Sequence, residues 1–274
     1  MSEWTGELAL DIEKKYDRST AKNIYFKGAF KVMRPVYHDA HSYPCYYLLN
    51  PGGGYIDGDT YHMTVNVGEE AGLTLTTQSA TKVYKTPTSH VYQENIFRLQ
   101  KNSYLEYLPD ALIAYKDARY TQHNKIYMEK GSTLIYTDIL TPGWSPEGDE
   151  FSYDTLRLKS EIYLEDELVL FDHIKLEPDK DNMSGIGMME GFTHLGSLLV
   201  IGEQATEEFV QRLYESLEGN FDKVGFGISK LNVPGFAIRI MGHMTQDIEH
   251  VITHCHQVIG KDWYQMSPSF LRKY

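Results

Sequence analysis

The stretch "DTLRLKSEIYLEDELVLFDHIKLEP", from Asp154 to Pro178, decides the fold class. Its first half alternates between apolar and polar residues, which is the period of a strand with one buried and one solvated face. The apolar face carries Leu156, Leu158, Ile162 and Leu164, and the polar face carries Arg157, Lys159, Glu161 and Tyr163. Glu165 to Glu167 form the predicted turn, after which "LVLFDHIKLE" returns as the second strand of a hairpin.

Similar short runs extend outward from this hairpin, over about Ala29 to Leu176. They include "GLTLTTQ", "SYLEYLP" and "STLIYTDILTPG", which are separated by turn residues and not by helical patterns. This arrangement is typical of a sandwich, a barrel or a coiled, β-helix-like stack of antiparallel strands. The sequence contains no repeat, linker or low-complexity segment, so we predict a mainly β fold that forms a single domain over residues 1–274.

Two α-helices are predicted late in the chain. The first begins near Thr206, a good N-cap that is followed by Glu207 and Glu208, and it ends before Gly219. The second begins near Thr245 and is predicted to end at Gly260. Each helix has one apolar stripe, so we expect both to pack on the sheet.

The composition excludes several classes of partner. The chain has 38 acidic and 26 basic side chains, a net charge of −12, which repels nucleic acids and anionic membranes. No apolar run approaches the ~20 residues that span a bilayer, and the N-terminus lacks the pattern of a signal peptide. The two cysteines, Cys45 and Cys255, form no CxxC pair. We therefore expect a cytoplasmic protein with reduced thiols.

The segment "NPGGGYIDGDT", Asn50 to Thr60, combines glycines with two carboxylates. It is not a phosphate loop, because the terminal Lys-Ser/Thr and the following helix are missing. It does not match an EF-hand either, since its sixth position counted from Asp57 is His62 instead of glycine. Asp57 and Asp59, with His62 close by, could converge on a cation. The alternative is an Asx-type turn in which the two aspartates cap backbone amides.

No established catalytic motif is present, neither GxSxG nor HExxH nor a Rossmann GxGxxG. The segment "HVITHCH" contains His250, His254 and His256 on the second predicted helix. Only His250 and His254 share a face there, and an exposed face without metal is the alternative to a metal site. A cupin-like metal enzyme would need HxH and a glutamate on neighbouring strands. The only HxH is His254-Cys255-His256, on a predicted helix.

Longer motifs run through the whole chain. "NPGGGYIDGDTYHMTVNVGEEAGLTLTTQSATKVYKT", Asn50 to Thr86, contains NPxGG, a following GD and TTQxAxKxY. "GAFKVMRP" at 28–35, "GFTHLGSLLVIG" at 191–202 and "IRIMG" at 238–242 extend the pattern. The sequence resembles the urease accessory protein D family, labelled H in some bacteria, over nearly its full length.

This resemblance implies a protein that is not an enzyme and is strand-rich with a pair of helices. Members of the family bind the urease apoprotein and, with accessory protein F and through it the GTPase accessory protein G, deliver nickel to urease through a water-filled passage. Nickel would then be transient cargo, with no tightly bound cofactor. A relay needs oxygen or imidazole ligands that release the ion, which makes Asp57, Asp59, His62 and Glu161 the candidates for the nickel route.

Two further expectations follow from the resemblance. The protein could instead be a purely structural adaptor that links urease to accessory protein F without contacting metal. The C-terminal segment from Trp263 to Tyr274 is the candidate contact with accessory protein F, because it carries several aromatic and apolar residues beyond the second helix.

Overall fold

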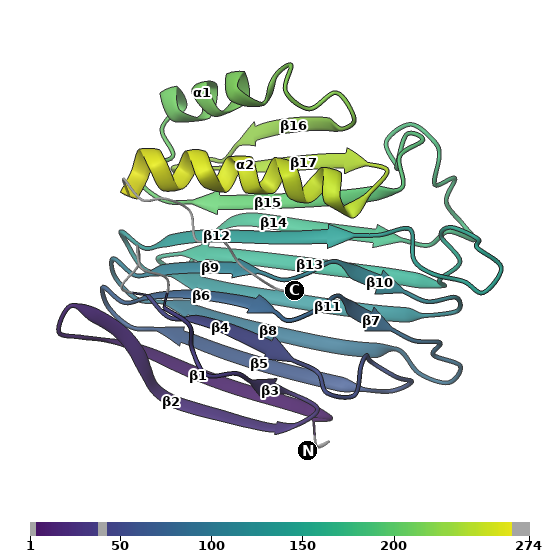
Figure 1. Ribbon diagram of the computed structural model, residues 1–274, viewed down its shortest axis with the longest axis horizontal. Coiled ribbons are helices and arrows are strands. Elements are labelled where there is room, and N and C mark those ends of the chain that lie inside the picture. The colour runs from purple at the N-terminus through teal and green to yellow at the C-terminus, as the bar shows by residue number, and fades with distance from the viewer. Residues whose placement is uncertain (1–3, 38–42, 265–274) are drawn as a thin grey trace.

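The computed structural model describes residues 4–37 and 43–264, which form two β-sheets stacked face to face with two helices at one end (Figure 1). The seven-stranded sheet contains, in spatial order, β14 (Glu167–Leu176), β13 (Thr155–Leu164), β11 (Arg119–Met128), β8 (Val91–Leu99), β5 (Thr60–Val67), β1 (Gly6–Lys15) and β2 (Arg18–Gly28). The ten-stranded sheet contains β16 (Gly225–Lys230), β17 (Gly235–Gly242), β15 (His194–Ile201), β12 (Thr133–Leu140), β9 (Tyr104–Leu108), β6 (Gly72–Thr77), β4 (Cys45–Leu49) and β3 (Lys31–Val32), with β10 (Leu112–Ala114) and β7 (Thr81–Val83) beside this row.

The middle of the chain coils from one sheet to the other and back. Strand β5 is followed by β6 in the opposite sheet, then β8, β9, β11, β12 and β13, so each turn of the coil lies on the previous one (Figure 1). The prediction of a mainly β, stacked fold is confirmed.

The strand direction differs from the expected antiparallel pairing. Strands β1, β5, β8, β11 and β13 pair in parallel, as do β4, β6, β9 and β12. Antiparallel pairs lie at the ends of the two sheets, such as β1–β2, β13–β14 and β15–β17. Parallel and antiparallel strands share a period of two, so alternation alone could not distinguish them.

The strand residues alternate between a buried inner face and a polar outer face. Strand β5 shows this most clearly, because Met63, Val65 and Val67 are fully buried while His62 and Thr64 lie on the outer face. The inner residues of both sheets form one large hydrophobic cluster between the sheets. The hairpin expected at Glu165–Glu167 is confirmed as β13–β14, and β16–β17 forms a second antiparallel hairpin.

The helices α1 (Glu207–Leu217) and α2 (Thr245–Tyr264) cover the outer face of the ten-stranded sheet near β15 and β17. The side chain of Thr206 accepts a hydrogen bond from the backbone of Phe209, which confirms the predicted N-cap. Helix α2 does not end at Gly260. It continues because Trp263 packs on Phe209, with ring centroids 4.9 Å apart, and this contact offsets the ~1 kcal/mol cost of a helical glycine.

No helix in the described part of the chain combines the length and the apolar character needed to cross a membrane.

Candidate functional site

The glycine-rich loop from Asn50 to Asp59 lets the chain approach its neighbours closely. Gly53 has a φ of +77°, and a Cβ on Gly54 would lie 2.6 Å from the Tyr84 ring and 2.9 Å from the Lys82 carbonyl oxygen. The loop then directs Tyr55 between the two sheets. The Tyr55 ring is 5% exposed and stacks on Tyr61, with centroids 3.9 Å apart. The loop therefore anchors an aromatic side chain in the interior.

The carboxylate of Asp57 joins this loop to the segment before β8. It accepts hydrogen bonds from the backbone N–H groups of Thr88 (3.1 Å) and Ser89 (2.8 Å) and from the Thr88 hydroxyl. These hydrogen bonds hold the pKa of Asp57 below its usual range. Asp57 therefore caps backbone amides, as in the alternative to a metal site, but these amides belong to a distant segment and not to a local Asx-type turn.

The carboxylate of Asp59 closes its own turn. Its Oδ2 accepts a hydrogen bond from the Ile56 N–H (2.9 Å) and another from the Tyr61 hydroxyl (2.8 Å). Asp59 therefore also holds the Tyr61 ring in place beneath Tyr55.

His62 and Glu161 lie elsewhere, on the outer face of the seven-stranded sheet. His62 Nδ1 is 3.2 Å from Glu94 Oε2, and its ring stacks on Trp4 at 5.0 Å. Glu161 accepts from Lys159 (2.7 Å) and lies 2.7 Å from His123 Nε2. Both contacts lower the pKa of Glu161, with Lys159 contributing most.

The structure therefore places the four predicted metal residues apart, with Asp57 and Asp59 at the loop and His62 and Glu161 on two strands separated by β8 and β11. Over residues 4–37 and 43–264, no three His, Cys, Asp or Glu side chains converge as a metal site would require. Their role in a nickel route stays a prediction.

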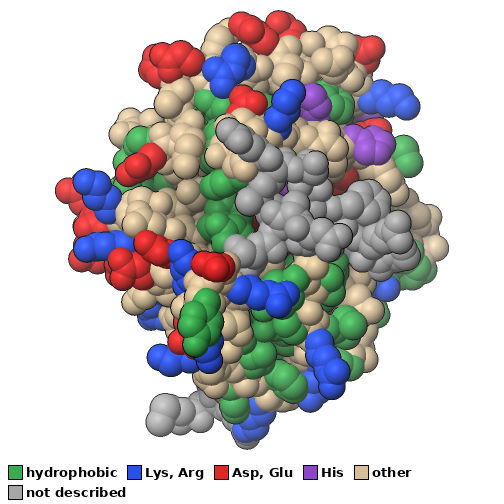
Figure 2. All heavy atoms as spheres, turned by 60° about the vertical axis from the view of Figure 1, so that its left-hand side comes forward, with side chains coloured by type: hydrophobic (Ala, Val, Ile, Leu, Met, Phe, Trp, Pro, Cys, Tyr) green, Lys and Arg blue, Asp and Glu red, His purple; other side chains and the backbone are tan. Residues whose placement is uncertain are grey.

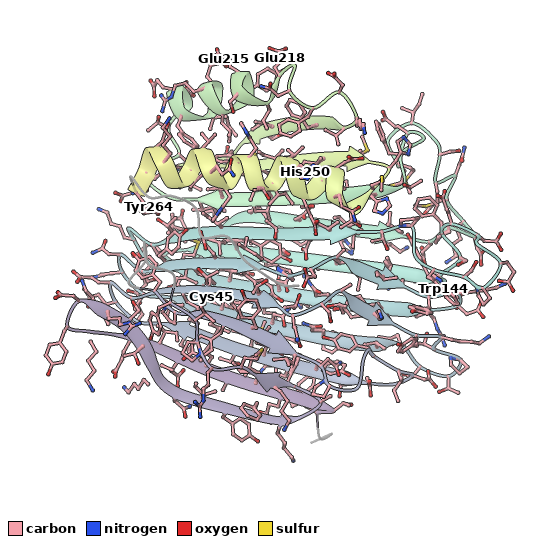
Figure 3. The ribbon with its side chains drawn as sticks, in the orientation of Figure 1. Cys45, Trp144, Glu215, Glu218, His250 and Tyr264 are labelled. Carbon is pink, nitrogen blue, oxygen red and sulfur yellow. The ribbon has the colours of Figure 1, made fainter. Side chains whose placement is uncertain are left out.

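The histidines of α2 also point to different neighbours. His250 is exposed in the N-terminal half of the helix, while Tyr264 lies at its C-terminal end (Figure 3). His254 Nε2 is 3.0 Å from the Ser216 hydroxyl, and His256 Nε2 is 2.5 Å from the buried carboxylate of Glu106. The sequence placed His256 on a different face of the helix from His250, and this geometry is consistent with that. The sequence did not predict that His256 pairs with Glu106.

A cavity of about 70 Å³ lies between the two sheets, behind the glycine-rich loop. Its lining is polar for an interior, since it includes Gln93, Gln122 and Asp138 together with Lys82 and the backbone of Gly54. The Tyr55 hydroxyl donates to Gln93 Oε1 (3.0 Å), which links the loop to these side chains. The glycine-rich loop therefore forms part of the wall of this cavity.

A row of buried polar side chains leads from this cavity across the inner face of the seven-stranded sheet. Asn95, Asn124 and Ser160 lie side by side on β8, β11 and β13, and they are joined by hydrogen bonds of 2.8 Å and 3.0 Å. The next strand continues the row with Asp172, which pairs with Arg239 of the opposite sheet. The hydrophobic core therefore contains a hydrogen-bonded polar track from Asn95 to Ser160, with the half-buried Asp172 next to it in the register.

Asp138 is the carboxylate of this interior. It lies on the inner face of β12 and accepts a hydrogen bond from Tyr136, whose hydroxyl also accepts from Asn124 (2.8 Å). Desolvation, and to a smaller extent the nearby Asp172 carboxylate, raise the pKa of Asp138 to about 7, although the hydrogen bond from Tyr136 lowers it. The sequence held a signal for this residue, because Leu134, Tyr136 and Asp138 alternate on one face of "STLIYTDIL".

The two cysteines contribute no exposed thiolate. Cys45 and Cys255 are both buried and form no disulfide, and burial raises the pKa of the Cys255 thiol to about 12. Burial therefore keeps both thiols from acting as surface ligands.

These features define a strand-built scaffold with a polar interior track. Comparison with known proteins then gives its family: the chain belongs to the UreD urease accessory proteins, whose family model matches residues 5–273. It is 46% identical to the urease accessory protein UreD of Lachnoclostridium phytofermentans over 274 residues, which is all of both chains. It is 43% identical to UreD of Staphylococcus aureus and of Staphylococcus epidermidis, with 99% of this chain covered in each case and 99% and 98% of those proteins.

Proposed function

We propose that this protein is a urease maturation factor that acts as a scaffold and as a nickel-transfer chaperone. In this proposal it works in the cytoplasm, binds the urease apoprotein and accessory protein F, and meets the GTPase accessory protein G through F. It is not an enzyme, and nickel is its cargo. Membership of the UreD family supports the role in urease maturation.

The observation that carries the nickel-transfer part is the polar track inside a hydrophobic core. A buried Asn–Asn–Ser row that leads to a half-buried aspartate is costly for a scaffold that needs only stability, because apolar side chains would fill the same space. Neutral amide and hydroxyl oxygens bind a divalent transition metal weakly and release it easily. A hydrated cation could therefore move along this row without being trapped.

Asp138 is the residue to which we assign the main ion contact. Its pKa of about 7 means that the carboxylate exchanges a proton readily near neutral pH. An arriving Ni²⁺ ion would displace this proton and form a carboxylate contact, and reprotonation would favour its release. Tyr136 orients the carboxylate, and Asp172 at the end of the row, which is paired with Arg239, is the next carboxylate.

Asp57, Asp59, His62 and Glu161 have a secondary place in this proposal. Their side chains already accept hydrogen bonds or contact charged neighbours, so an ion would have to compete with these partners. Asp57 and Asp59 border the loop that leads to the cavity, which makes them candidates for a first, weak contact with the cargo.

The experiment is an assembly of urease from purified apoprotein, accessory proteins F and G, GTP and nickel, with and without this protein. The expected result is that nickel per urease active site falls to background when this protein is left out. Normal nickel loading in its absence would overturn the proposal.

The purely structural adaptor remains the second candidate, and the capping roles of Asp57 and Asp59 favour it at the loop. An adaptor would make nickel loading depend on the protein but not on its interior carboxylates. A cupin-like metal enzyme receives no support from the geometry, because His254 and His256 contact Ser216 and Glu106 on different sides of α2.

A further inference from the structure

The hydrophobic core is open at the end of the stack formed by β2 and β3. Ile24 and Phe26 of β2 lie opposite Leu10 and Leu8 of β1, and therefore on the same, inner face of the sheet. Leu8 and Leu10 are fully buried, whereas Ile24 is 41% and Phe26 is 38% exposed. The opposite sheet ends at the two-residue strand β3, which covers this part of β2 only in part, with the Lys31 side chain over Phe26.

The backbone of β2 is also available at this end. Within the described residues, β2 is the last strand of its sheet and pairs only with β1. The register shifts at Lys22, where Asp11 faces Asn23 and Ile12 faces Ala21, so this lysine occupies a bulge. Beyond the bulge the segment from Asn23 to Gly28 is regular, and in the described part of the chain only its edge toward β1 pairs with a strand.

This end of the molecule carries the opposite charge to the rest. Residues 14–34, which we call the basic end, contain seven of the 26 Lys and Arg residues and only one of the 38 Asp and Glu residues. Figure 2 shows basic and hydrophobic side chains together at the lower end of the molecule, where β1 to β3 lie in Figure 1, and acidic side chains toward the top. Lys14 pairs with Glu70, and the Lys31 ammonium lies over the Phe26 ring at 4.9 Å.

We infer that the basic end is a docking surface for an extended, acidic segment of a partner protein. The segment adds to the sheet as a strand beside Asn23–Gly28 and places apolar side chains over Ile24 and Phe26. Its acidic side chains alternate with the apolar ones and therefore lie on the outer face, near Lys27, while Lys22 occupies the bulge at the start of this segment. Three independent features fit one occupant: a free strand edge, an open apolar row and a local positive charge.

Other occupants satisfy fewer of these features. A second copy of the chain would bring one basic end against another, which like charges oppose. The chain's own residues 265–274 contain Arg272 and Lys273 and no acidic residue, so they carry the wrong charge. A nucleic acid or an anionic membrane would use the positive charge but would leave the strand edge of β2 unpaired. This inference goes beyond the proposed function, because it does not depend on nickel transfer.

The test uses a blocked peptide that alternates glutamate with valine and has the length of β2, 11 residues. Hydrogen exchange of the full-length protein is measured with and without the peptide. We expect exchange in residues 23–28 to slow about tenfold at saturation, with a Kd on the order of 10 μM. The matched controls are a lysine–valine peptide of the same length and a glutamate–valine peptide N-methylated at alternate residues, and neither should protect this segment.

Two double variants that change the net charge by the same amount test whether the peptide binds at the basic end. Lys22→Glu with Lys27→Glu should weaken binding of the glutamate–valine peptide about tenfold or more. Lys130→Glu with Lys223→Glu, on exposed positions elsewhere, should leave it unchanged. Equal weakening by both pairs would overturn the inference.

Further measurements test the other possible occupants, which are nucleic acid, a membrane, a second copy of the chain and the chain's own C-terminal residues. Protection of residues 23–28 by a DNA duplex or by phosphatidylserine vesicles, without protection by the acidic peptide, would overturn the inference. So would a stable dimer in sedimentation that already protects this segment, or exposure of the segment on truncation after Tyr264.

Discussion

The carboxylate of Glu106 on β9 is paired with the imidazole of His256 on α2, 150 residues later, with Oε1 and Nε2 2.5 Å apart. Glu106 also accepts hydrogen bonds from Thr74 (2.8 Å) and Tyr104. The pair fastens α2 to the ten-stranded sheet at a point where the surroundings are otherwise apolar. We predict that His256→Ala lowers the free energy of unfolding by about 3 kcal/mol, because it leaves a buried carboxylate without its cation. Urea unfolding measures this loss, and His250→Ala, at an exposed position, is the control.

The same pair predicts a pH dependence of stability. The Glu106 carboxylate raises the pKa of His256 above 6.5 in the folded protein. The pair therefore stabilises the folded state fully below pH 6.5, and this stabilisation is lost as the pH rises through the folded-state pKa of His256. The pKa of Glu106 is lowered to about 2, so its contribution is lost only as pH falls toward that value. Unfolding of the parent protein should therefore become easier above neutral pH, and Glu106→Gln should flatten this decline. An unchanged slope in Glu106→Gln would show that the pair is not its source.

The Asp57 cap gives a prediction about the glycine-rich loop. Asp57→Ala removes the hydrogen bonds to Thr88 and Ser89, so it should lower stability and reduce the yield of soluble protein. Thermal unfolding and nickel per urease are measured on the same preparation. Unchanged stability together with lower nickel content would instead favour the relay role of Asp57.

Gly54 is the glycine of this loop with the least space around it. Gly54→Ala would drive a methyl group against the Tyr84 ring and the Lys82 carbonyl, so we predict a loss of about 2 kcal/mol and displacement of Tyr55. Gly52→Ala is the control, because the nearest atom there is the Asn50 side chain at 3.2 Å. Tyrosine fluorescence and urea unfolding report the two effects, and equal stability of both variants would contradict the account.

Asp138 should reduce stability as its carboxyl group ionises. Its pKa rises from 3.8 to about 7 on folding, so the folded state holds the proton more tightly and the free energy of unfolding falls between these pH values. Asp138→Asn should remove this decline and be at least as stable as the parent protein at pH 8. Asp149→Asn, at an exposed position, should retain the parent's slope. A parent protein whose stability does not change in this range would contradict the assigned pKa.

The sequence predicted those elements whose evidence is local. The alternation at Leu156 to Leu164 gave β13 and its inner face, and the cap at Thr206 gave the start of α1. The end of α2 was misplaced because the Trp263–Phe209 contact joins residues far apart in the chain, and it outweighs the local preference at Gly260.

The candidate site was less accessible to sequence reasoning. The aspartates of the loop were found because they are close in sequence, yet the structure gives Asp57 backbone partners from another segment, at Thr88 and Ser89, while Asp59 caps its own turn. The track through Asn124 and Ser160 depends on which strands are neighbours, and a period of two does not reveal strand order. His256 lies at the edge of the apolar stripe of α2, so its buried partner could not be identified without the sheet.

The central claim is that an interior carboxylate, and not only the scaffold, carries nickel to urease. It is tested most directly by nickel per urease active site after assembly with the Asp138→Asn variant, measured together with the yield of the assembled complex. The account predicts a normal yield and nickel content about tenfold lower than with the parent protein or the Asp149→Asn control, because the amide cannot provide the negative charge that binds the ion. Full nickel loading in the Asp138→Asn complex would contradict it.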